Sequence, residues 1–163
     1  MHHISDLDWE DHIRTGRKYL ETAVNGLARP AVFNNTLIFQ LTAMAVEKLL
    51  VGVFQYNGKM PCGHTLDGLV DELSLFCPLD KDLAEKIKEL GRFDDMCPLV
   101  PVNRIIPDAV QIKAILAVGD QVAEFAGRQV KSADGGTQTT GSKGWIDETD
   151  KNRRCLQGRA QCG

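Results

Sequence analysis

Residues 35 to 56 carry apolar side chains in nearly every direction of a helix, and no other feature constrains the fold as strongly. The pattern begins at Asn34–Asn35 and ends at Asn57–Gly58, which are typical N-cap and C-terminal stop residues. An ordinary surface helix keeps one broad polar side, so this helix must be packed on two or three sides at the centre of the fold. Any apolar surface that the other helices leave uncovered favours self-association, most simply through a two-fold interface. The apolar positions are Leu37, Phe39, Leu41, Met44, Val46, Leu49, Leu50, Val53 and Phe54.

Four further helices are predicted, over about residues 8–28, 65–76, 80–91 and 107–130, from apolar positions at helical spacing. Thr65 and Asp80 are suited to cap the third and fourth helices, and Pro107 is suited to be the first residue of the fifth. A proline-rich loop is expected over residues 93–106, and no period-two strand pattern is convincing. The sequence therefore predicts an all-α fold, an up-down antiparallel bundle of four to five helices.

The chain of 163 residues is long enough for one domain with its own core. We expect the bundle over residues 1–131 and a polar, glycine-rich, disordered tail over residues 132–163. Residues 1–130 contain 13 Lys and Arg against 18 Asp and Glu, a net charge of −5. Such a domain is a poor general binder of nucleic acid, although it leaves room for a local basic patch.

Cysteine usage and targeting signals favour a cytoplasmic protein. The five cysteines are widely spaced and include no CxxC pair, and no HExxH motif is present, so we expect no metal site and no cofactor. The amino terminus lacks the basic start and apolar run of a signal peptide, and polar residues interrupt the apolar stretch 37–54, which argues against a membrane span. In that compartment the thiols would be reduced.

Two short motifs resemble the HEPN domain family. The first is Ala45-Val46-Glu47-Lys48-Leu49-Leu50 followed, after a loop, by His64-Thr65-Leu66. It is similar to the "A-x-E-K-x-L" helix and the "H-x-L" helix start of that family. The second, Arg104-Ile105-Ile106-Pro107-Asp108, is similar to an Arg-Tyr-Pro-Asp segment before the last helix, with one extra residue and Ile in place of Tyr. The resemblance covers roughly residues 5–130.

The resemblance implies a helical bundle that is commonly dimeric, binds nucleotides, and is often partnered with a small nucleotidyltransferase in toxin–antitoxin or defence modules. A subset of the family are metal-independent ribonucleases with an Arg-x(4–6)-His motif. This chain has no arginine four to six residues before any histidine, and Lys59, with four residues between it and His64, is the nearest approximation. Lysine keeps the charge but lacks the planar fork that grips phosphate at two points.

Lys48, His64 and Arg104 are the candidate ligand-binding residues, and we expect no catalytic residue and no metal ligand. Each has a structural alternative. Glu47 and Lys48 could instead specify packing through salt bridges, His64 could hydrogen-bond its loop, and Arg104 could anchor the proline-rich loop. We therefore expect a homodimeric binding module for a nucleotide or RNA phosphate, or for a nucleotidyltransferase. The alternatives are a ribonuclease toxin that uses His64 with Lys59 or Arg104, and a purely structural assembly domain.

Overall fold

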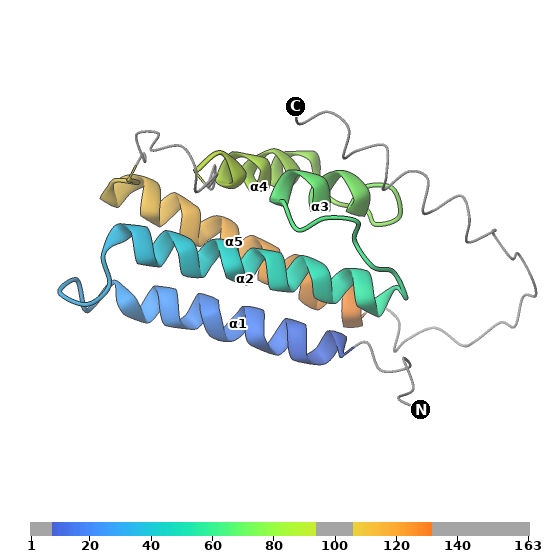
Figure 1. Ribbon diagram of the computed structural model, residues 1–163, viewed down its shortest axis with the longest axis horizontal. Helices are drawn as coiled ribbons and strands as arrows, with labels where there is room; N and C mark the ends of the chain where they lie inside the picture. The colour runs from blue at the N-terminus through green and yellow to red at the C-terminus, as the bar shows by residue number, and fades with distance from the viewer. Residues whose placement is uncertain (1–7, 94–105, 132–163) are drawn as a thin grey trace, which may run out of the picture. The chain divides into compact units, whose positions relative to one another are not determined.

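Helices pack side by side in the computed structural model, which describes residues 8–93 and 106–131 (Figure 1). Within those residues the fold is all-α and contains no strand, which confirms the predicted class. The tail predicted for residues 132–163 and most of the proline-rich loop lie outside the described residues. The helices are α1 (Trp9–Gly26), α2 (Asn35–Tyr56), α3 (Leu66–Leu73), α4 (Lys81–Phe93) and α5 (Ala109–Lys131).

The central position of α2 follows from its composition. α2 contacts each of the other helices, most extensively α1 and α5, and Figure 1 shows it between α1 and the α3–α4 pair. It is long and apolar enough to cross a membrane by length and composition, but 67% of its most apolar window is buried inside the protein. Its apolar surface is thus largely used for helix packing. The buried side chains include Val46, Leu49, Leu50, Val53 and Phe54.

Two glycines set the close approach of α1 to α2. A Cβ atom on Gly16 of α1 would lie 2.8 Å from Cγ of Leu49, and one on Gly52 of α2 would lie 2.7 Å from Cδ1 of Ile13. Small residues let helix backbones approach, and side chains from the other helix fill the space that the missing Cβ leaves. The two contacts also establish the register of the antiparallel pair, with Ile13 level with Gly52 and Gly16 level with Leu49.

The helix starts agree with the predicted caps at three positions and differ at one. Asn34 Oδ1 accepts from Leu37 N at 2.9 Å, Thr65 Oγ1 from Gly68 N at 3.3 Å, and Asp80 Oδ1 from Leu83 N at 3.2 Å. The prediction that Pro107 is the first residue of α5 is wrong, because the helix begins at Ala109. Asp108 caps it instead, and its Oδ1 accepts from the backbone amides of Val110 and Gln111. Pro107 is buried before the cap, and its carbonyl accepts a hydrogen bond from the Asn35 side chain at 2.8 Å.

An ion pair joins α3 to α4. Lys88 Nζ lies 2.7 Å from Asp71 Oδ1, and this hydrogen bond raises the pKa of the lysine above its ordinary value. Cys77 is buried and free, and desolvation raises its pKa. The expectation of reduced thiols is wrong for Cys62, which is disulfide-bonded. Disulfide formation depends on the distance between two cysteines in space, which their wide spacing along the chain did not reveal.

Candidate functional site

His64 lies directly before α3 and is tied to α2. Its Nδ1 donates to Oε1 of Glu47 at 3.2 Å, a contact between residues 17 positions apart. The His64 side chain is 73% exposed and that of Glu47 32%. An exposed pair of this kind contributes little to folding stability, so its main effect is to orient the imidazole. Because Nδ1 carries the donated proton, Nε2 of the neutral ring is the nitrogen left to meet a ligand.

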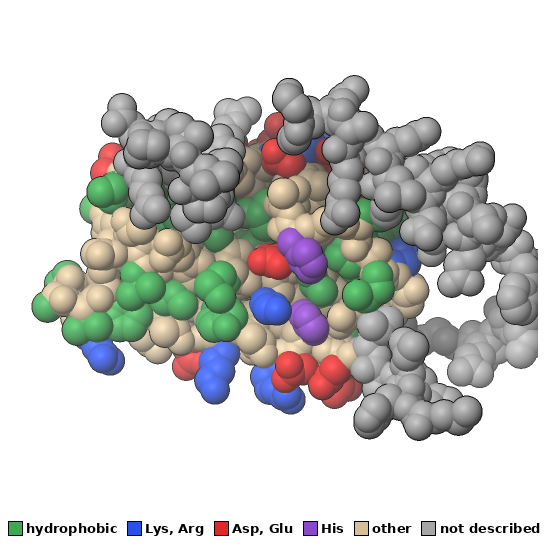
Figure 2. Space-filling model, viewed as in Figure 1, with side chains coloured by type: hydrophobic (Ala, Val, Ile, Leu, Met, Phe, Trp, Pro, Cys, Tyr) green, Lys and Arg blue, Asp and Glu red, His purple; other side chains and the backbone are tan. Residues whose placement is uncertain are grey.

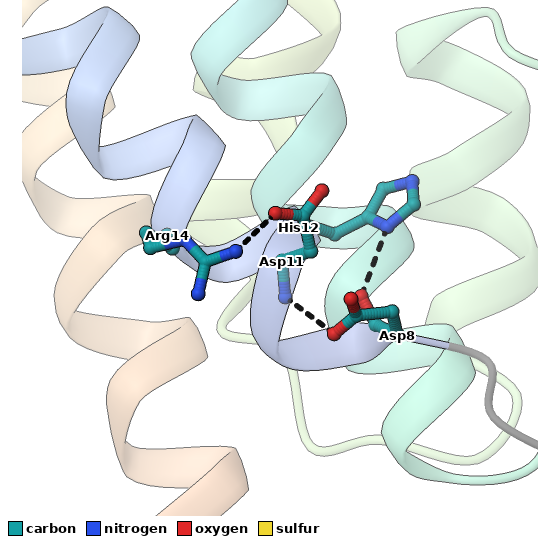
Figure 3. A network of polar contacts seen from close by, with 4 residues as sticks. All are labelled: Asp8, Asp11, His12 and Arg14. Carbon is teal, nitrogen blue, oxygen red and sulfur yellow. Dashed lines mark hydrogen bonds and ion pairs between the residues drawn. The ribbon is translucent and has the colours of Figure 1, made fainter.

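A second histidine, His12 in the first turns of α1, is oriented in a similar way. Its Nδ1 donates to the backbone carbonyl of Asp8 at 3.2 Å, which again leaves Nε2 for a ligand. Figure 3 shows the network that holds this turn: the Asp8 carboxylate accepts from Asp11 N at 3.0 Å, and Asp11 forms an ion pair with Arg14. Asp8 therefore caps α1 with its carboxylate and orients His12 with its backbone carbonyl.

Helix register places His12 and Lys48 within about a turn and a half of each other. Because Ile13 is level with Gly52 and Gly16 with Leu49, Lys48 is level with Arg17, which lies five residues after His12 in α1. On α2, Lys48 is half-buried and forms no ion pair among the described residues. Figure 2 shows the described histidines (purple) on one face of the protein, beside a basic and an acidic side chain. We call the set His12, Glu47, Lys48 and His64 the histidine face.

The predicted site is thus only partly assembled in the described residues. Glu47 of α2 holds His64, and Lys48 is the next residue of that helix, with its side chain about 100° further round the helix axis. Arg104 lies outside the described residues. Lys59, the cation nearest to the missing arginine in sequence, places Nζ 5.1 Å from the ring centroid of Phe76, so its charge is engaged in a cation–π contact.

His12 is the site residue that the sequence did not reveal. It stands 52 positions before His64, in a helix whose exposed side carries ordinary polar residues. Neither its spacing from other candidate residues nor the composition of its helix identifies His12 as a site residue. Its role depends on the register of α1 against α2, which two glycine contacts determine.

A separate hollow of about 520 Å³ lies between α1 and α5. Arg17, whose guanidinium packs where a side chain on Gly127 would lie, also borders a second hollow of the same volume along α1. Three basic groups and two acidic groups line the α1–α5 hollow, a net charge of +1. Its lining residues are Arg17, Asp120, Ala123, Glu124, Gly127, Arg128 and Lys131.

Comparison with known proteins supports the fold and leaves the function open. No protein-family model and no curated protein matches this chain. The crystal structure of TT1696 from Thermus thermophilus is similar, with a TM-score of 0.62 and 17% sequence identity, over 74% of this chain and 97% of that chain. At this identity the likeness establishes a shared helical fold and nothing about ligands. Among the described residues no three His, Cys, Asp or Glu side chains are grouped to hold a metal ion.

Proposed function

We propose that this chain is a HEPN-like helical binding module whose histidine face holds the phosphate of a nucleotide or of RNA. The observation that supports the proposal is the grouping of His12, Lys48 and His64 on one exposed face. When protonated at Nε2 as well as Nδ1, the two imidazoles can donate hydrogen bonds and supply positive charge to phosphate oxygens, as can the Lys48 ammonium, which has no ion pair among the described residues. Residues 1–130 as a whole contain more acidic than basic groups, so an anion depends on a local grouping of donors such as this one.

A small nucleotidyltransferase is the protein partner that we propose on the basis of the HEPN resemblance alone. An adjacent gene that encodes such an enzyme would support this partner. Co-purification of the two proteins would test the interaction directly, and failure of the two to associate when produced together would remove this part of the proposal without affecting ligand binding.

Replacement of Lys48 by alanine is expected to weaken phosphate binding at least about tenfold, because a charge-assisted hydrogen bond contributes roughly 1.5–3 kcal/mol. Titration calorimetry with ATP, GTP and a short RNA oligonucleotide measures this. His12→Ala and His64→Ala should each lower the affinity as well. The matched control is Lys113→Ala, which removes an exposed lysine from α5 and should leave the affinity unchanged. Equal affinity of wild type and all four variants would contradict the site assignment.

The two histidines also favour a second candidate function, metal-independent cleavage of RNA. One imidazole would take the proton of a 2′-hydroxyl as its oxygen attacks the adjacent phosphorus. The other would protonate the departing 5′-oxygen, which leaves a 2′,3′-cyclic phosphate, and Lys48 would stabilise the charge on phosphorus. This differs from the sequence-based version, in which His64 works with Lys59 or Arg104.

Cleavage of a fluorogenic RNA in the presence of a metal chelator tests the second candidate. The expected result is product formation that falls by roughly 100-fold or more in His12→Ala and in His64→Ala, the range of general acid–base catalysis. A substrate with 2′-deoxyribose at the scissile position is the control and should remain intact. If the wild type does not cleave the RNA, the cleavage candidate is rejected and phosphate binding stays the proposed function of this face.

A further inference from the structure

The hollow between α1 and α5 is separate from the histidine face. Two small residues of α5, the half-buried Ala123 and the buried Gly127, leave about 520 Å³ open there, a volume within the range of small-molecule sites in proteins. Arg17 lines the hollow from α1. Because Arg17 follows His12 by five residues, the two side chains lie about 140° apart around the axis of α1.

Arg17 has no charged partner within the part of the chain that the structure describes. A Cβ atom on Gly127 would lie 2.8 Å from Nη2 of Arg17, so the guanidinium occupies the space that the glycine leaves. No ion pair among the described residues includes Arg17. Its donors are therefore available to an anionic group at the level of Gly127.

Charge changes sign along the α5 side of the hollow. Asp120 and Lys131 follow one line of the helix, eleven residues apart. Between them Glu124 and Arg128 lie 3.9 Å from each other and partly offset each other's charge. The Asp120 carboxylate remains at one end, and the cations Arg17 and Lys131 remain at the other. The Arg17 guanidinium, at the level of residue 127, lies about 10 Å along the helix axis from Asp120.

This arrangement disfavours a ligand that carries charge of only one sign. A polyanion attracted by the cations is repelled by Asp120, and a simple cation meets the converse. We propose that the α1–α5 hollow binds a zwitterion, a free peptide of about three residues. An extended chain spans roughly 3.3–3.6 Å per residue, so a tripeptide brings its carboxylate to Arg17 when its ammonium reaches Asp120. The planar fork of the guanidinium suits a carboxylate.

The basic residues in the last turn of α5 also have a structural explanation. Arg128 and Lys131 complement the negative carboxyl end of their helix. That explanation does not extend to Arg17, which comes from the middle of α1, or to Gly127, which leaves room for its guanidinium. These two residues are therefore the ones to replace.

Titration of the ¹⁵N-labelled full chain with tri-L-alanine, followed by amide NMR shifts, tests the site. The expected result is a saturable shift of amide signals around residues 120–131 with a Kd of roughly 1 mM, since the site is open and salt screens its charges. N-acetyl-tri-L-alanine amide has the same backbone without either terminal charge and should bind at least about tenfold more weakly. The absence of a saturable shift at roughly 20 times that Kd, or equal binding of the capped peptide, would overturn the proposal.

Gly127→Ala should weaken tri-L-alanine binding about tenfold, because the added Cβ displaces the guanidinium and a charge-assisted hydrogen bond corresponds to a factor of this order. The atom that must move is the end of a flexible side chain, so the helices should persist, which circular dichroism checks. Arg17→Met keeps much of the aliphatic stem and should show the same loss. Wild-type affinity in either variant would overturn the site.

Two further variants separate this site from the rest of the surface. Lys81→Ala removes an exposed lysine of α4 that does not line the hollow, and Lys48→Ala alters the histidine face. Both should bind tri-L-alanine as the wild type does, so the peptide site and the proposed phosphate site can fail independently. A loss of peptide affinity in Lys48→Ala would show that the peptide binds elsewhere and would overturn the assignment to the α1–α5 hollow.

Discussion

Replacement of Phe54 by alanine is expected to lower the free energy of unfolding by about 3–5 kcal/mol, the range for removal of a buried aromatic side chain. Phe54 is 2% exposed in the second half of α2. Its ring packs edge-to-face against Phe76, with the ring centroids 5.2 Å apart and an interplanar angle of 71°. The substitution removes both this aromatic contact and the packing that joins α2 to the segment between α3 and α4. Urea unfolding followed by circular dichroism measures the loss.

Two controls test whether the loss comes from this buried contact. Phe54→Leu keeps most of the volume and should cost less than Phe54→Ala, because the residual cavity is smaller. Leu75→Ala removes a side chain that is 85% exposed and should change stability by less than about 0.5 kcal/mol. A Phe54→Ala protein as stable as wild type would show that the ring is not part of the core in solution.

Introduction of leucine at Gly16 is expected to cost about 3 kcal/mol, the upper part of the usual range for overpacking. Even a Cβ atom there would lie 2.8 Å from Cγ of Leu49 and 3.0 Å from the carbonyl oxygen of Ala45. The leucine side chain can change its rotamer, but the carbonyl belongs to the backbone of α2, so the helices must separate. The gain of about 0.5–1 kcal/mol for replacing glycine within a helix is too small to offset this.

The matched control for Gly16→Leu is Gly63→Leu, since a Cβ at Gly63 meets nothing within 4 Å. The free energies of unfolding of the two variants, obtained from urea titrations, should differ by most of the predicted loss. Adding Leu49→Ala to Gly16→Leu should recover part of the stability, because the two residues are in contact and their effects are coupled. If both leucine variants unfold at the same urea concentration, the close approach of α1 to α2 is not what requires glycine.

The helices were predictable because their signals are local. Asn34, Thr65 and Asp80 cap from within the first turn of their own helices, and a cap needs only a side chain within reach of nearby amides. The start of α5 was misplaced for an equally local reason. Pro107 is compatible with a first helical position, but Asp108 is the stronger cap, and its carboxylate moved the helix start past the proline.

The candidate site was predictable only in part. The sequence identified Lys48 and His64 separately, but it left open whether Glu47 would pair across helices. The structure answers this with the Glu47–His64 contact at 3.2 Å. His12 was missed, and Arg104 lies outside the described residues.

The sequence by itself determined that this protein is an α-helical bundle built around residues 35–56, because the periodicity of apolar residues and the caps act within single helices. The tertiary structure alone decided which polar groups share a face. Gly16 and Gly52 establish the register of α1 against α2, and that register brings His12 within about a turn and a half of Lys48 along the helices. Contacts between distant residues depend on how helices approach one another. This is a property of packed surfaces that no single helix contains.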